Sequence, residues 1–167
     1  MTNRRRILEG AALGVALFVA VPMRRALADG DPLTKALDKS DVLYLTPIKS
    51  NGQESKCHAE VWFAHVNGVI YVCSEAKTWR ARAVQKGLTK ARVWVGEYGP
   101  WQKANGAFKK APTVDVTASL VTAADQQAPV LDVMGDKYKM SWLRWGPEFK
   151  DGLKSGKRVL IEYRPAA

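Results

Sequence analysis

The sequence predicts a mainly β protein: a six-stranded antiparallel barrel, closed or nearly closed, with a few short helices. Segments rich in β-branched and aromatic residues alternate with turn signals, as strands and hairpins do. Asn51-Gly52 and Asn67-Gly68 are residue pairs that tight hairpin turns favour, because both central positions need a positive φ. The helical patterns are short, so consecutive strands are joined mostly by hairpins, which is typical of an antiparallel barrel.

Six segments have strand patterns: 41–48, 54–65, 69–74, 91–98, 113–121 and 157–164. The second is long enough to bend across a barrel. Because strand side chains alternate between faces, Ala59, Val61 and Phe63 form its expected core face. The opposite face then presents His58, Glu60 and Trp62.

Helical patterns occur at two places between these strands. Residues 77–86 predict a short helix, and Gly87 suits its C-terminal cap. Residues 128–138 predict a second helix with Val130, Leu131 and Met134 on one stripe. Residues 139–155 are aromatic and have no regular period, and 29–40 are expected to be a mobile leader that ends in a short helical turn.

The first 28 residues have the pattern of an export signal. Arg4-Arg5-Arg6 is followed by an uncharged run at 10–21 and by Ala26-Leu27-Ala28, a small-x-small cleavage site. The apolar run is shorter than the roughly 20 residues of a spanning helix. The arginine pair resembles a twin-arginine signal. We therefore expect export by the twin-arginine machinery, cleavage near Ala28 and a periplasmic or extracellular mature protein, with an uncleaved anchor as the alternative.

Net charge gives little support to a nucleic-acid partner. The chain has 26 basic and 16 acidic residues, a net charge of +10. Five Arg and one Glu belong to residues 1–28, so the remaining 21 basic and 15 acidic residues leave +6. These charges are scattered, whereas nucleic-acid binding needs a clustered basic face. Residues 41–167 are expected to form one barrel domain.

The two cysteines are expected to be free thiols. If Asn67-Gly68 is the hairpin turn, Cys73 lies opposite Trp62, and Cys57 lies five residues further along on the other face. A disulfide needs Cα atoms within about 7 Å. No metal site is expected.

The segment from Ser74 to Arg80 predicts an anion site, most often one for phosphate. Hydroxyls at Ser74 and Thr78 stand at the start of a predicted helix, Arg80 can pair with an anion in bidentate fashion, and Lys77 adds a point charge. The alternative interpretation is a Ser/Thr helix cap with solvated cations behind it.

The motifs on either side of the Asn67-Gly68 turn resemble the pyridoxamine-phosphate-oxidase-like, flavin-binding split-barrel superfamily. The resemblance lies in Val61-Trp62-Phe63, Tyr71-Val72-Cys73-Ser74 and Thr78-Trp79-Arg80-Ala81. It implies a six-stranded antiparallel split barrel, a homodimer with two cofactor sites at its interface, and FMN as cofactor, with deazaflavin second.

The resemblance also implies site residues. Ser74 stands at the family's threonine, Thr78 at its serine and Arg80 at its phosphate-binding lysine. The remaining expected cofactor contacts are Lys77, Cys73 at a tyrosine position, His58 at an arginine position, and Trp62. Trp79 departs from the pattern because it replaces a frequent arginine.

The function expected from these residues is that of an exported flavin-type oxidoreductase acting on a small-molecule substrate. The cofactor would carry the hydride or electron exchange, so no catalytic side chain is expected. No arrangement of histidine, carboxylate and nucleophile supports hydrolysis. The alternatives are a haem-like ligand, a cofactor-free module that binds a small ligand, and a structural protein with no ligand.

Overall fold

The computed structural model of the chain describes residues 30–166. The signal peptide predicted for residues 1–28, with its cleavage site near Ala28, lies outside the described residues. Within the described part, no helix is both long enough and apolar enough to cross a membrane.

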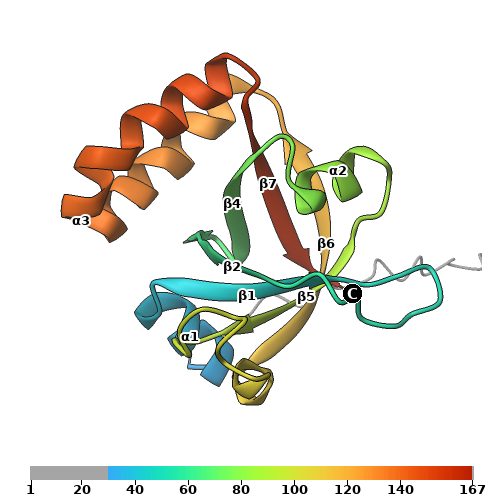
Figure 1. Ribbon diagram of the computed structural model, residues 1–167. Coiled ribbons are helices and arrows are strands. Elements are labelled where there is room, and N and C mark those ends of the chain that lie inside the picture. Colours follow the sequence, from blue (N-terminus) through green and yellow to red (C-terminus); the bar gives the residue numbers. More distant parts are fainter. Residues whose placement is uncertain (1–29, 167) are drawn as a thin grey trace, which may run out of the picture.

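A seven-stranded antiparallel sheet forms the body of the protein (Figure 1). Its strands are β1 (Val42–Pro47), β2 (Ala59–Trp62), β3 (Ala64–Val66), β4 (Val69–Glu75), β5 (Lys90–Val95), β6 (Thr113–Val121) and β7 (Arg158–Pro165). Their order in the sheet is β2-β1-β5-β6-β7-β4-β3. The two edge strands, β2 and β3, are neighbours in the chain, so the sheet curls until its edges meet as a nearly closed barrel.

The expected second strand at 54–65 is divided at Phe63, which is why the sheet has seven strands rather than six. On one side Trp62 pairs with Val42 of β1, and on the other Ala64 pairs with Tyr71 of β4. The hairpin register is confirmed for β3. The expectation that Cys73 lies opposite Trp62 is wrong, because the pairing with β4 ends at Ala64 and Trp62 pairs with Val42 of β1 instead. Residues 59–66 therefore pair with β1 before Phe63 and with β4 after it, because the two edges of the curled sheet meet at this residue.

Alternating side chains of the strands fill the barrel. Ala59, Val61 and Phe63 are all buried, as their spacing predicts. They belong to one core cluster with inward-facing residues of the other strands, among them Leu43, Leu45, Ile70, Val72, Val93 and Ile161.

Helix α1 (Pro32–Lys39) packs against this core. Leu33 and Leu37 are only 6% and 1% exposed and join the core cluster. The amphipathic pattern at 33–37 therefore marks a helix, as predicted, but this helix is packed on the core and is not the end of a mobile leader.

The short helix α2 (Trp79–Gln85) follows β4, as predicted, and a 3₁₀ turn, η1 (Ala107–Lys110), precedes β6. Gly87 has a φ of +80° just beyond the end of α2. This left-handed conformation favours glycine and explains why the helix stops there.

Helix α3 (Ala124–Lys154) doubles back on itself at Lys139, where φ is 38° and ψ is −105° (Figure 1). Its first arm contains the predicted helix, and the predicted stripe of Val130, Leu131 and Met134 is buried against β3, β4 and β7. The expectation that 139–155 is irregular is wrong, because these residues form a second helical arm. Pro147 lies within that arm, and a proline there argues against a helix when only the sequence is considered.

Candidate functional site

The two hydroxyls of the predicted anion segment are engaged within the protein. Ser74 faces the barrel interior, is 1% exposed and accepts a hydrogen bond from Nε of Arg80 at 2.5 Å. The hydroxyl of Thr78 donates to the carbonyl of Glu75 at 2.8 Å and does not cap α2. These contacts fix the turn from Glu75 to Thr78, so the alternative interpretation as a side-chain helix cap does not hold for Thr78.

Arg80 lies half-buried behind this turn. Burial lowers the pKa of its guanidinium, whereas Tyr163 and Glu75 raise that pKa and the charge of Arg158 lowers it. Within residues 30–166, no carboxylate lies within ion-pair distance of Arg80. The segment therefore has a partly buried cation whose only side-chain hydrogen bond within the described residues is to the neutral hydroxyl of Ser74.

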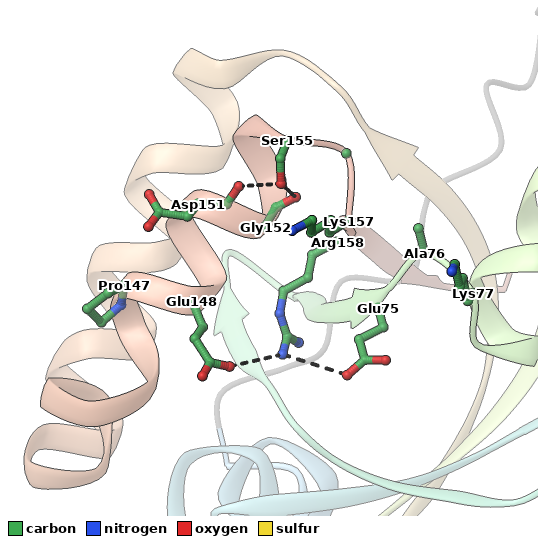
Figure 2. Close-up of a pocket in the computed structure, with 11 residues that line it drawn as sticks. Glu75, Ala76, Lys77, Pro147, Glu148, Asp151, Gly152, Ser155, Lys157 and Arg158 are labelled. Atoms are coloured by element: carbon green, nitrogen blue, oxygen red, sulfur yellow. Dashed lines mark hydrogen bonds and ion pairs between the residues drawn. The ribbon is translucent and has the colours of Figure 1, made fainter.

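A cleft of about 660 Å³ opens between this turn and the second arm of α3 (Figure 2). We call it the Arg158 cleft. Its volume is within the range of small-molecule sites, roughly 300–1,000 Å³. The turn contributes Glu75, Ala76 and Lys77, and the facing wall contributes Glu148, Asp151, Lys157 and Arg158.

Arg158 is the least exposed cation of the cleft. Its side chain is 17% exposed, and its Nη2 lies 4.0 Å from Glu75 and 3.8 Å from Glu148, distances too long for hydrogen bonds. The guanidinium carbon lies 4.5 Å from the centre of the Phe149 ring. Gly152 provides the space, because a Cβ there would lie 2.7 Å from Cδ of Arg158. The arginine is thus positioned by packing and only loosely paired (Figure 2).

Comparison with solved structures identifies the fold. The haem-storage protein HutZ from Vibrio cholerae is 16% identical, with a TM-score of 0.56 over 81% of this chain and 88% of that one. A candidate pyridoxamine 5′-phosphate oxidase from Listeria innocua is 15% identical, with a TM-score of 0.53 over 82% of this chain and 93% of that one. An FAD-binding protein from Mesorhizobium loti is 16% identical, with a TM-score of 0.53 over 84% of this chain and 91% of that one.

The fold is a split barrel. At this level of identity the likeness shows the fold alone. No protein-family model matches the chain, and no curated protein matches it.

The split barrel does not bring His58 to the anion segment. If the hairpin pairing around Asn67-Gly68 continued, residue 58 would lie beside Lys77. Because the strand is divided at Phe63, the His58 ring instead contacts the rings of Trp101 and Phe108. Burial lowers the pKa of His58, and its buried Nδ1 has no hydrogen-bond partner in the described part of the chain. A role for His58 at the phosphate is therefore not supported by this arrangement.

Cys73 and Trp62 lie together beneath α3 rather than in the cleft. Burial raises the pKa of the Cys73 thiol to about 12, so this thiol is protonated at neutral pH. Trp62 stacks on Tyr138 with ring centres 4.3 Å apart. Both cysteines are free thiols, as predicted, and Cys57 is exposed.

Sequence reasoning missed Arg158 and its neighbour Lys157. Arg158 begins β7 and Lys157 directly precedes it. The strand β7 lies beside β4 only because the sheet closes through that pairing, in which Glu75 is opposite Arg158. The sequence near Arg158 indicates an anion site only through the two adjacent cations that follow the Ser155-Gly156 turn. In residues 30–166, no group of three or more His, Cys, Asp or Glu is arranged to hold a metal ion.

Proposed function

We propose that this protein binds a phosphorylated flavin-type cofactor, FMN first and deazaflavin second, and takes part in redox chemistry. The observation that carries the proposal is the Arg158 guanidinium, which lies in a cleft wall with carboxylates no nearer than 3.8 Å. Buried guanidinium groups are best satisfied by bidentate hydrogen bonds to an anion, and a phosphate group provides them. The FAD-binding protein that shares the fold supports a flavin ligand by analogy, whereas the haem-storage protein supports the alternative of a haem-like ligand.

The residues of the cleft have distinct roles in this proposal. Arg158 binds the phosphate, and the exposed Lys77 across the cleft adds a mobile positive charge. Ser74, Thr78 and Arg80 hold the turn in place from inside, and the charge of Arg80 adds to the field felt by an anion. When bound, the cofactor supplies hydride or electron exchange, so the chain's own task is binding and orientation.

An absorption spectrum of the protein purified from its native host without refolding tests the ligand class. We expect the absorption bands of oxidised flavin or of deazaflavin. A haem spectrum would replace the flavin proposal with a haem-like ligand. A featureless spectrum that stays featureless after FMN and deazaflavin are added would leave a cofactor-free small-ligand module or a structural protein, and would overturn the proposal.

Substitution of Arg158 tests the site itself. Arg158→Ala should weaken FMN binding by about 1.5–3 kcal/mol, roughly 10- to 150-fold, because a charged hydrogen bond is lost. Arg80→Ala, the anchor derived from the sequence, should weaken binding in the same range. Fluorescence titration with FMN and with deazaflavin measures both effects.

Arg82→Ala is the matched control, because Arg82 is exposed on the same short helix as Arg80. Thermal unfolding of each variant separates lost binding from lost folding, and Arg158→Lys should restore part of the affinity through charge alone. Unchanged affinity for both cofactors in Arg158→Ala and Arg80→Ala, with Arg82→Ala also unchanged, would rule out this anion site.

A further inference from the structure

The turn between the two arms of α3 exposes large apolar side chains. Met140 is 79% exposed, Leu143 73% and Trp145 37%. We call residues 139–145 the hairpin tip. Elsewhere in the described residues, Leu88 and Tyr98 complete the set of exposed large hydrophobic side chains. Three of these five exposed side chains therefore lie within six residues of one another in the chain. A cluster of exposed apolar side chains indicates an interaction surface, whereas single ones are ordinary.

The packing of the arms explains why these side chains have nothing to cover them. Trp142 fills the space between the arms, because a Cβ at Gly135 or Gly146 would lie 3.0 or 2.8 Å from its Nε1. Its ring also packs on Phe149, with ring centres 5.2 Å apart. The inner face of the hairpin is thus complete without Met140 and Leu143. These two residues are three positions apart in the second arm, so they lie on one helix face.

The charge around the tip has one sign. Lys139 and Arg144 are the charged residues of the hairpin tip, and the nearest acidic residues in the sequence are Asp136 and Glu148. The guanidinium carbon of Arg144 lies 4.9 Å from the centre of the Trp145 ring. Apolar side chains bordered by cations and an indole match a surface that is anionic outside and apolar beneath.

We propose that the hairpin tip docks on an anionic lipid bilayer surface. Met140 and Leu143 enter the acyl region, Trp145 lies at the interface, and Lys139 and Arg144 meet lipid phosphates. The α3 hairpin projects from the barrel (Figure 1). A protein partner would need an apolar groove shaped to receive this tip. A deformable bilayer needs no such groove.

Vesicle flotation with the full chain purified from its native host tests the proposal. We expect binding to vesicles of phosphatidylcholine mixed with phosphatidylglycerol, and weaker binding to phosphatidylcholine alone or at high salt. The double variant Met140→Ser/Leu143→Ser should bind at least about tenfold more weakly, and Arg144→Glu should weaken binding by about fivefold or more.

Leu88→Ser is the matched control, because Leu88 is 52% exposed on another part of the molecule. It should leave vesicle binding unchanged. Residues 1–28 are the same in all variants, so any contribution they make to binding cancels. Lipids with brominated acyl chains should quench part of the tryptophan fluorescence, and Trp145→Phe should remove that part.

Three outcomes would overturn the proposal. The first is no binding to either kind of vesicle. The second is equal binding by wild type and Met140→Ser/Leu143→Ser. The third is a change of oligomeric state in that variant, measured by sedimentation, with vesicle binding intact; this would assign the tip to contact with a second copy of the chain.

Discussion

Phe63 belongs to neither of the two strand ladders that meet beside it, so its backbone groups need another partner. Tyr138 provides one. The Phe63 N–H donates to the Tyr138 hydroxyl at 2.8 Å, and this hydroxyl lies within donating distance of the carbonyls of Asp41, at 2.8 Å, and Phe63, at 3.0 Å. One side chain of α3 therefore replaces hydrogen bonds that the sheet lacks where its edges meet.

Tyr138→Phe should destabilise the protein by about 1–3 kcal/mol, because it leaves a buried N–H unsatisfied while keeping the ring that stacks on Trp62. Urea unfolding measures the change. Tyr71→Phe is the control, since the half-buried Tyr71 hydroxyl makes no hydrogen bond to the described part of the chain, and it should cost less. Equal effects of the two substitutions would show that the hydrogen bonds of the Tyr138 hydroxyl contribute nothing specific to stability.

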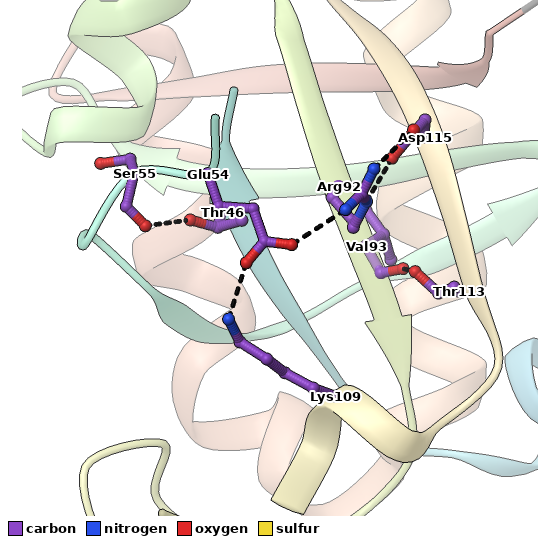
Figure 3. Close-up of polar contacts among 8 residues, drawn as sticks. All are labelled: Thr46, Glu54, Ser55, Arg92, Val93, Lys109, Thr113 and Asp115. Carbon is purple, nitrogen blue, oxygen red and sulfur yellow. Dashed lines mark hydrogen bonds and ion pairs between the residues drawn. The ribbon is translucent and has the colours of Figure 1, made fainter. Parts of the chain in front are cut away.

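At the scale of elements, an ion-pair network joins the 48–54 turn region to β5, β6 and η1 (Figure 3). Nη1 of Arg92 donates to Glu54 at 2.9 Å, and the same guanidinium binds Asp115 through Nε and Nη2 at 2.5 and 2.9 Å. Nζ of Lys109 donates to the other oxygen of Glu54 at 2.7 Å. The Glu54 carboxylate therefore links strand β5, through Arg92, to the 3₁₀ turn η1, through Lys109.

Glu54→Gln should lower stability by about 0.5–1.5 kcal/mol at neutral pH, since partly exposed pairs are worth little individually. The hydrogen bonds from Lys109 and then Arg92 hold the pKa of the Glu54 carboxyl below its ordinary value of 4.5, against the effect of burial. The stabilisation is therefore fully present above pH 4.5 and is lost as the pH falls through the lowered pKa.

Urea unfolding of wild type and Glu54→Gln at several pH values measures this dependence. The two proteins should converge in stability in acid. Glu75→Gln is the control, because Glu75 is 69% exposed and makes a single ion pair, at 4.0 Å, with the described part of the chain. A difference between wild type and Glu54→Gln that is constant with pH would contradict the assignment to the ionised carboxylate.

At the scale of the whole molecule, α1 extends the domain beyond the barrel strands. Leu37 is 1% exposed within the main core cluster, although it precedes the first strand. A chain that begins at residue 41 would lack the side chains that cover this part of the core. The folded unit therefore includes α1.

Leu37→Ala should cost about 2–5 kcal/mol, as large-to-small substitutions in a core do. Chemical denaturation gives the value, with Lys35→Ala on the exposed side of the same helix as the control. A cost below about 0.5 kcal/mol, the usual scale of surface substitutions, would show that α1 is only loosely attached to the barrel.

Features that depend on local pattern could be predicted from the sequence. The strand at 113–121, the short helix before Gly87 and the buried face of Ala59, Val61 and Phe63 all agree with the structure. Each follows from turn chemistry or side-chain period, which neighbouring residues carry on their own. Export, homodimerisation and the identity of the cofactor stay predictions.

Features that depend on closing the sheet could not be predicted, because they arise from long-range contacts. The change of partner at Phe63 separates His58 from Lys77, and the pairing of β4 with β7 brings Arg158 to the cleft. The second arm of α3 is stabilised by packing around Trp142, which overrides the breaking tendency of Gly146 and Pro147. These contacts join residues far apart in the chain, and their free energy depends on partners that no local pattern identifies.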